Sequence, residues 1–194
     1  MKISVLSLQG DFAEHAEYFR KAGAEVELVK SADKIRNSEA LVIPGGESTT
    51  YNRLMKQFGI IDALRELKEK GVPVFGTCNG LILLARSAKG EDPDYSLGFL
   101  DITVSRNAYG RQRESFEADI SLLIDGKNVF RGIFIRAPKI QEVGPSVEVL
   151  AKLGDEPVLV RQGPFLGATF HPELTDDTRI AEYFIRLAEN KGKI

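Results

Sequence analysis

The sequence predicts an α/β fold: a three-layer sandwich whose central, mostly parallel sheet is extended by antiparallel strands. In the first half, apolar runs of strand length alternate with helical segments, which is typical of a parallel sheet covered by helices on both faces. In the second half, short extended runs follow one another across turns such as Gly154-Asp-Glu-Pro157, as antiparallel strands do. An amphipathic segment near the C-terminus predicts a helix that packs against this sheet.

The expected elements follow from the apolar periodicity and the turn residues, in chain order. The first half contains expected strands near 3–8, 25–29, 40–43 and 72–75 and expected helices near 11–22, 49–70 (broken at Gly59) and 80–87. The second half contains expected strands near 115–120, 132–136, 147–153, 157–162 and 165–170 and a last helix near 176–190. Because no long linker, repeat or low-complexity tract divides the 194 residues, we predict one domain over residues 1–194.

The composition is that of a compact enzyme rather than of a protein that binds nucleic acid or a membrane. The chain is 43% hydrophobic and 28% charged, and its formal net charge of −2 provides no basic field for nucleic acid or anionic lipid. The longest uncharged run, residues 71–85, is broken by Gly, Pro and Asn and is too short to cross a bilayer. The single cysteine cannot form an internal disulfide, and the N-terminus begins directly with a strand and has no signal-peptide pattern. We therefore expect a cytoplasmic protein.

The most informative segment is Val72–Gly80, because it places the only cysteine on a sharp turn between an apolar strand and a helix. Its core, Gly76-x-Cys78-x-Gly80, is the cysteine counterpart of the G-x-S-x-G nucleophile elbow. The flanking glycines allow a tight turn and a close approach of substrate to the backbone. The partial positive charge of a helix N-terminus favours the thiolate, so Cys78 is a candidate nucleophile. The alternative is an inert, buried thiol.

A second signal is His171, which follows an apolar run and is held in place by Pro172. A thiol nucleophile needs a base, and that base needs a third group to fix its tautomer. Residues two apart on extended backbone point to the same side, so we expect Glu173 to hold one imidazole nitrogen while the other faces Cys78. The alternative is a surface loop with an incidental histidine. For the only other histidine, His15, the charged helical surroundings predict a solvated or partner-facing role.

The third element is the turn Pro44-Gly45-Gly46, which ends the expected strand 40–43. Two adjacent glycines leave backbone N–H groups unshielded, as an oxyanion hole requires. Ser48 or Thr49 is expected to cap the helix that follows. In isolation, the same residues fit an ordinary turn equally well.

Together the three segments resemble the class I (triad) glutamine amidotransferases in chain order and spacing. They are Pro44–Ser48, Gly76–Gly80 and His171–Glu173. Leu8–Phe12 and Arg106–Phe116 resemble one branch of that family, the glutaminase subunits of pyridoxal 5′-phosphate synthase. The resemblance covers the chain from Ile3 to the last helix and implies a flavodoxin-like, class I glutamine amidotransferase-like fold. One position departs from the branch: Asn79 stands where alanine is usual, a change that keeps the backbone N–H.

The resemblance implies a glutaminase in which Cys78, His171 and Glu173 are catalytic. It also implies a glutamine pocket formed by Gly46, Glu47, Ser48, Arg106, Ile135 and Arg136. Its oxyanion hole would be the backbone N–H groups of Gly46 and Asn79. The guanidinium of Arg106 or Arg136 suits the substrate α-carboxylate, although each arginine fits a surface or partner-facing role equally well. We expect neither a cofactor nor a metal.

The resemblance further implies L-glutamine as substrate and a heteromeric complex with a TIM-barrel subunit of pyridoxal 5′-phosphate synthase. The polar first helix, from Asp11 onward, and residues 106–113 flank the inferred site and are the expected docking surfaces. Two alternatives stay open: a glutaminase serving another synthase, such as imidazole glycerol phosphate synthase, and a catalytically silent binding scaffold. The Arg106–Phe116 segment speaks against the first alternative, and the complete set of Cys78, His171 and Glu173 against the second.

Overall fold

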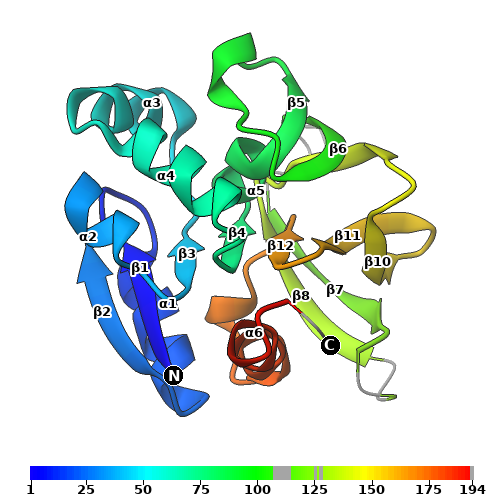
Figure 1. Cartoon of the computed structure of the whole chain (residues 1–194). Helices are drawn as coiled ribbons and strands as arrows, with labels where there is room; N and C mark the ends of the chain where they lie inside the picture. The colour runs from blue at the N-terminus through cyan, green and yellow to red at the C-terminus, as the bar shows by residue number, and fades with distance from the viewer. Residues whose placement is uncertain (107–114, 125, 127–128, 193–194) are drawn as a thin grey trace.

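A nine-stranded mixed sheet forms the centre of the computed structural model, which describes residues 1–106, 115–124, 126 and 129–192 (Figure 1). Its strands are β1 (Lys2–Leu6), β2 (Glu25–Val29), β3 (Leu41–Ile43), β4 (Val74–Thr77), β7 (Ser115–Leu122), β8 (Val129–Ile135), β10 (Glu148–Leu153), β11 (Glu156–Gln162) and β12 (Phe165–Ala168). They lie side by side in the order β2-β1-β3-β4-β12-β11-β10-β7-β8.

The sheet has a parallel half and an antiparallel half. Neighbouring strands from β2 through β1, β3 and β4 to β12 all pair in parallel, so their carboxyl ends meet at one edge. From β12 onward, β11, β10, β7 and β8 pair antiparallel. The predicted parallel sheet with an antiparallel extension is confirmed.

Helices cover both faces of this sheet. One face carries α1 (Phe12–Lys21) and α6 (Arg179–Glu189), and the other carries α2 (Ala32–Arg36), α3 (Ser48–Gln57), α4 (Ile60–Glu69) and α5 (Asn79–Leu84). Successive strand residues alternate between the two cores, because side chains along a strand point to opposite faces. Val5 packs in the core that includes Phe19 and Phe184, whereas Leu6 packs in the core that includes Leu64. The three predicted layers follow from this alternation.

The structure contains a second, three-stranded sheet, β5-β6-β9, that the sequence analysis did not predict. It is formed by β5 (Ala85–Lys89), β6 (Leu100–Ser105) and β9 (Lys139–Val143). The expected helix 80–87 is wrong at its end, because the chain leaves the helix after Leu84 and pairs from Ala85 onward with β6. Tertiary strand pairing thus overrides the local helix preference of this apolar segment. The short helix α2 and the 3-10 turn η1 (Pro93–Tyr95) were also missed.

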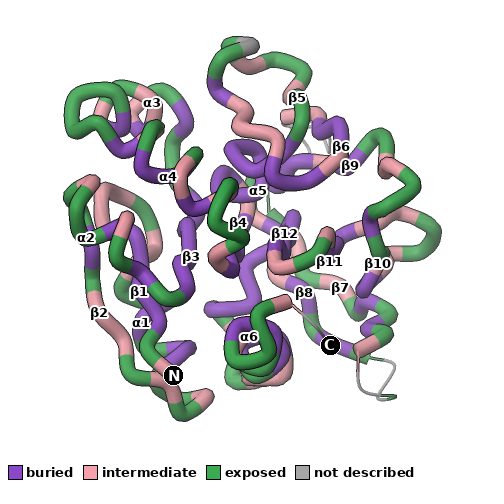
Figure 2. The backbone as a smooth tube through the Cα atoms, viewed as in Figure 1, coloured by how far each residue is buried: buried purple, intermediate pink, exposed green. Residues whose placement is uncertain are grey.

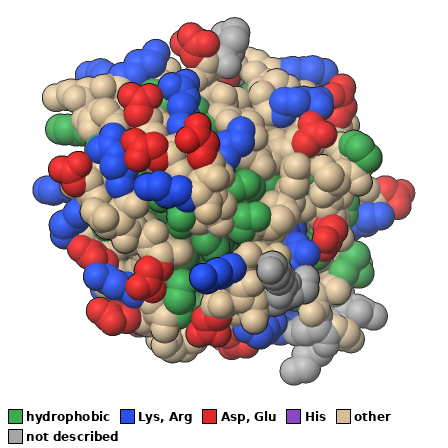
Figure 3. All heavy atoms as spheres, viewed as in Figure 1, with side chains coloured by type: hydrophobic (Ala, Val, Ile, Leu, Met, Phe, Trp, Pro, Cys, Tyr) green, Lys and Arg blue, Asp and Glu red, His purple; other side chains and the backbone are tan. Residues whose placement is uncertain are grey.

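The burial pattern follows the layers. Buried residues are concentrated in β3, β4, β12 and α5, at the centre of the molecule, while the outer turns of α3 and α4 are exposed (Figure 2). On the face shown in Figure 3, cationic and anionic side chains are interspersed. Among the described residues, we find no helix with both the length and the apolar character that a membrane span requires.

Candidate active site

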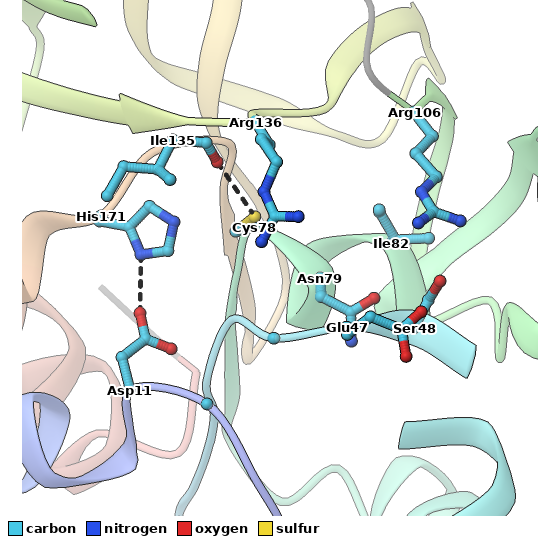
Figure 4. A pocket seen from close by; sticks show the side chains of 12 residues that line it. Asp11, Glu47, Ser48, Cys78, Asn79, Ile82, Arg106, Ile135, Arg136 and His171 are labelled. Atoms are coloured by element: carbon cyan, nitrogen blue, oxygen red, sulfur yellow. Dashed lines mark hydrogen bonds and ion pairs between the residues drawn. The ribbon is translucent and has the colours of Figure 1, made fainter. Parts of the chain in front are cut away.

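The carboxyl ends of the parallel strands surround a pocket of about 300 Å³ (Figure 4). Its lining comes from the segments that follow β1, β3, β4, β6 and β12 and from the end of β8. It consists of Gly10, Asp11, Gly46, Glu47, Ser48, Cys78, Asn79, Ile82, Arg106, Ile135, Arg136 and His171. Of the site residues predicted from the sequence, all but Glu173 line this pocket. Glu173 lies in the interior and contacts the His171 ring.

Cys78 occupies a strained turn between β4 and α5. Its φ of 50° and ψ of −105° place a non-glycine residue in a sparsely populated backbone region. A Cβ on Gly80 would lie 2.1 Å from the Ile43 carbonyl oxygen, and one on Gly76 would lie 2.6 Å from the Gly80 backbone. The glycines therefore permit the close packing that a nucleophile elbow needs. The thiol donates to the Ile135 carbonyl oxygen, with Sγ and O 3.8 Å apart.

Two backbone segments flank the sulfur as possible oxyanion donors. Asn79 is the first residue of α5, where a backbone N–H has no acceptor inside the helix. Its side chain is held by Tyr95, whose hydroxyl accepts from Nδ2 at 2.8 Å and donates to Oδ1 at 3.0 Å. The asparagine amide is thus engaged elsewhere, and the backbone N–H is left for a ligand. Gly46, with φ 150°, packs so closely on Gln9 that a Cβ would lie 2.5 Å from its amide nitrogen.

The His171 ring is held by two carboxylates. Nδ1 lies 2.7 Å from Oε1 of Glu173 and 2.8 Å from Oδ2 of Asp11. The predicted contact with Glu173 is confirmed, but its structural basis differs: Glu173 lies in the 3-10 turn η3 (Pro172–Leu174) and not on extended backbone. Because Nδ1 is occupied, Nε2 is the nitrogen left for Cys78.

This cluster shifts the pKa values of its members. Burial alone would lower the pKa of His171, but its hydrogen bonds with Asp11, Cys78 and Glu173 raise it well above the ordinary value. Burial would raise the pKa of Asp11, but hydrogen bonds with His171 and Glu173 bring it well below the ordinary value. Burial raises the pKa of Glu173 to about 8, and the hydrogen bond to His171 opposes that rise only in part. The carboxyl pair therefore holds its negative charge mainly on Asp11.

The second histidine also belongs to this region, contrary to the expectation of a solvated or partner-facing role. His15 is fully buried, with Nε2 2.9 Å from Oγ1 of Thr77 and 3.4 Å from Oε2 of Glu173. Burial lowers the pKa of His15 to about 3, so the ring is neutral. The charged neighbours Glu14 and Glu17 lie on the exposed face of α1, and the helical period turns His15 inward.

The opposite end of the pocket is built around Glu91. This carboxylate accepts from the Ser48 hydroxyl at 2.7 Å, and its Oε1 lies 3.0 Å from a guanidinium nitrogen of Arg106. Two of the predicted glutamine-binding residues are therefore already joined by an acid. Arg136 follows β8 with φ 42° and lines the pocket, and within the described ranges it makes no ion pair.

The cap of α3 corrects one sequence-based expectation. The N-cap is Glu47, whose carboxylate accepts from the backbone N–H groups of Thr49 at 2.9 Å and Thr50 at 2.8 Å. Neither Ser48 nor Thr49 caps the helix, because the Ser48 hydroxyl is bound to Glu91. These bonds hold the pKa of Glu47 near 2. The Glu47 carboxylate is thus occupied by the helix terminus.

Three functional candidates were missed from the sequence: Asp11, His15 and Glu91. Asp11 follows the first parallel strand, so the rule that strand ends share an edge could have placed it at the site. The spacing of four residues from Asp11 to His15 could have placed both on one side of α1. Glu91 follows the unexpected strand β5, and no local sequence pattern predicts that Glu91 reaches the site. Of the two expected docking surfaces, the first helix begins beside the pocket, which Asp11 lines, and residues 107–113 lie outside the described residues.

A cysteine on a strained strand-to-helix turn, a histidine held by Asp11 and the buried Glu173, and a parallel sheet with an antiparallel extension agree with the class I glutamine amidotransferases that the sequence resembles. The sequence model of the SNO glutamine amidotransferase family matches residues 5–190. The chain belongs to this family.

Curated relatives and solved structures agree with this assignment. The chain is 51% identical over 188 residues to "Pyridoxal 5′-phosphate synthase subunit PdxT" of Pseudothermotoga lettingae, covering 97% of this chain and 96% of the relative. It is 50% identical over 194 residues to the protein of the same name from Halalkalibacterium halodurans, covering 100% and 98%. A solved glutamine amidotransferase superposes with a TM-score of 0.90 at 48% identity, covering 96% of this chain and 98% of the other. The glutaminase domain of Trypanosoma brucei CTPS shares the fold, with a TM-score of 0.67 at 13% identity over 100% of this chain and 96% of that one.

Proposed function

We propose that this chain hydrolyses L-glutamine to L-glutamate and ammonia, with Cys78 as nucleophile, His171 as acid and base, and Glu173 as the group that orients His171. The chain is the glutaminase subunit of a pyridoxal 5′-phosphate synthase, because its family is that of the SNO glutamine amidotransferases and its relatives are named as subunits of that synthase. One observation carries the assignment of residues: Cys78, Asn79, Gly46, His171 and Arg136 converge on a single pocket. One glutaminase domain over residues 1–194 is part of this proposal, supported by the two cores on opposite faces of the same sheet.

The reaction proceeds in two steps. The Cys78 thiol gives its proton to His171, and its sulfur attacks the side-chain amide carbon of glutamine. The new oxyanion is held by the backbone N–H groups of Gly46 and Asn79, each worth about 10²–10³ in rate. His171 protonates the leaving nitrogen, so the C–N bond breaks, ammonia departs and a glutamyl thioester remains. Water then gives a proton to His171 and attacks the thioester carbon. The C–S bond breaks, glutamate is released, and His171 returns the proton to the Cys78 sulfur.

The outer pocket is suited to the amino acid end of glutamine. Arg136 supplies a guanidinium for the α-carboxylate, because Arg106 is already paired with Glu91. Ile135, Glu47 and Ser48 complete the wall on either side. We assign these residues and Gly46 to glutamine binding, with Arg136 as the main carboxylate partner.

We propose that the ammonia passes to a separate TIM-barrel synthase subunit in a heteromeric complex. The relatives are named as subunits of a synthase, and ammonia released without an acceptor would be wasted. The Pro44-Gly45-Gly46 turn can reorient at modest cost, so a site completed only in the complex fits this fold. Because the mechanism needs a free thiol, we also place the protein in the cytoplasm.

The test is ammonia release from glutamine, measured with and without the synthase subunit for the wild type, Cys78→Ala and Cys78→Ser. We expect turnover to rise at least several-fold with the synthase subunit and to vanish in both variants. Unchanged melting temperatures of the variants would show that the fold is intact. Turnover by Cys78→Ala would overturn the nucleophile, and equal turnover with and without the synthase subunit would overturn the dependence on a partner. Absence of turnover by the wild type in the complex would favour the binding scaffold.

A further inference from the structure

Glu173 is held between two histidines, one at each of its carboxylate oxygens. Oε1 contacts Nδ1 of His171, and Oε2 faces Nε2 of His15 at 3.4 Å. Building on the proposed glutaminase function, we propose that His15 is a positioning residue of the reaction. As a neutral imidazole, it donates its Nε2–H to Oε2 of Glu173 and Oγ1 of Thr77, and so fixes the triad acid relative to the residue that precedes Cys78.

The surroundings of His15 select this tautomer. Its Nδ1 is buried and has no hydrogen-bond partner among the described residues, whereas Nε2 faces two oxygen atoms, one of them in a carboxyl group. A buried N–H without an acceptor is more costly than an unused lone pair. The proton therefore belongs on Nε2, where both neighbours can accept it. The fully buried ring stays neutral, which makes it a donor that adds no charge to the cluster.

Glu173 needs such a donor. Its Oε2 is buried and has no hydrogen bond within the described part of the chain, and Nε2 of His15 is the donor that faces it. Burial disfavours the ionised carboxylate, and hydrogen bonds from N–H groups restore it. A separation of 3.4 Å is long for a hydrogen bond, and such contacts often tighten once the substrate is bound. A donor at Oε2 therefore opposes the rise in the pKa of Glu173 that burial causes, and it fixes the carboxyl group that contacts His171.

Asp11, His15 and Glu173 also place a ligand atom each within 4.8 Å of one another, a spacing that raises the question of a metal site. The contacts argue for hydrogen bonding instead. Asp11 and Glu173 both direct an oxygen at Nδ1 of His171, and Nε2 of His15 is bound to Thr77. A cation at this point would compete with Thr77 for Nε2 of His15.

Several titratable groups surround Glu173 and contribute to its pH response. Asp11 faces Glu173 from the loop before α1, Tyr18 from α1 itself, and His171 from the segment before η3. Cys78 acts on His171 from the turn after β4. Because these groups are retained when His15 alone is replaced, a change in the pH profile reports on the His15 contact.

The experiment compares His15→Leu, which keeps the volume but loses the donor, with His15→Gln, which keeps an N–H near the position of Nε2. Phe19→Leu is the matched control, because Phe19 is a fully buried residue of the same helix in the core beside Phe184. Glutamate formation is measured between pH 5 and 9 in the complex with the synthase subunit. For His15→Leu we expect kcat to fall about tenfold or more with little change in KM, and the acidic limb of the profile to move to higher pH. His15→Gln should recover most of the loss, and Phe19→Leu should keep the wild-type profile.

Each outcome bears on the proposal separately from the glutaminase function. If the wild type is active and His15→Leu matches it in kcat and pH profile, the positioning role is overturned while the proposed function stands. Equal loss in the Leu and Gln variants, with an unmoved pH profile, would reduce His15 to a packing residue. If the variants fail to fold, ¹⁵N NMR of the wild-type histidines decides: a neutral Nε2–H tautomer at pH 7 is expected, and an Nδ1–H tautomer or a charged ring would contradict it.

Discussion

The inner end of the pocket adjoins a buried cluster of titratable side chains, whereas the side chains of the outer end are more exposed to solvent. At the inner end, the side chains of Glu173 and His15 are completely buried, and that of His171 is 7% exposed. At the outer end, the Arg106 side chain is 35% exposed and is fixed by Glu91 alone among the described acids. The inner end is therefore the more tightly packed of the two.

This contrast separates the groups that react from the groups that bind the substrate. A reacting group must be held in place before the substrate arrives, and burial with several hydrogen bonds achieves this. A binding group can be ordered by the ligand itself. We therefore expect substitutions at the inner end to lower kcat and substitutions at the outer end to raise KM.

The largest effect is expected for His171→Asn. Asparagine supplies no base for the proton transfers, so kcat should fall by about 10³-fold or more. Steady-state glutamate formation in the complex measures the loss, and circular dichroism checks the fold. Activity equal to that of the wild type would remove His171 from the mechanism.

Glu173→Gln should lower kcat less than His171→Asn does, by about tenfold to a hundredfold. Asp11 keeps its contact with Nδ1 of His171 and can hold the ring when Glu173 is neutralised. The double variant Asp11→Asn/Glu173→Gln removes both acids and should approach the loss seen for His171→Asn. If Glu173→Gln alone is as inactive as His171→Asn, Asp11 provides no support and the inner cluster is organised differently.

At the outer end, Arg136→Ala should raise KM for glutamine by about tenfold or more, the cost of a lost charge-assisted hydrogen bond, with a smaller change in kcat. Arg106→Ala should raise KM less, because Glu91 already neutralises that guanidinium. Arg131→Ala on β8 is the matched control, since Arg131 is exposed and pairs with Glu117 and Asp119. A kcat loss without a KM change in Arg136→Ala would contradict the division between the two ends.

The smallest effect is expected for the contribution of the Asp11–His171 ion pair to the free energy of unfolding. The folded-state pKa of Asp11 lies below its ordinary value of 3.8, so its contribution is complete well above pH 4 and is lost as the pH falls toward the folded-state pKa. The folded-state pKa of His171 lies above 6.5, so its contribution is complete below pH 6.5 and is lost as the pH rises toward its folded-state pKa. The ion pair therefore stabilises most between about pH 4 and 6.5 and remains substantial at neutral pH.

Asp11→Asn should accordingly lower the free energy of unfolding by about 1 kcal/mol near pH 6, with a difference that shrinks as the pH falls below 4. Urea unfolding of wild type and variant at pH 6 and pH 3 measures it. A difference that is larger at pH 3 than at pH 6 would contradict the assignment of the charge to Asp11.

The sequence was sufficient for the parallel half of the fold and for the residues that reach the pocket from it. Cys78, Gly46 and His171 follow apolar strands directly, so local patterns placed them at one edge. Asp11 and His15 were misplaced because charged neighbours on α1 hid the buried face, and only the tertiary contact with His171 and Glu173 identifies it. The second sheet and Glu91 depend on long-range pairing between β5, β6 and β9, which leaves no periodic signature in the chain.

Whether Cys78 is the nucleophile is tested by covalent labelling of the complex with an electrophilic glutamine analogue such as a chloroketone, followed by peptide mass mapping. We predict one adduct, on the peptide that contains Cys78, formed in step with the loss of glutaminase activity and slowed by added glutamine. Complete labelling of Cys78 with activity retained, or inactivation without an adduct at Cys78, would contradict the assignment of Cys78 as the nucleophile of this glutaminase.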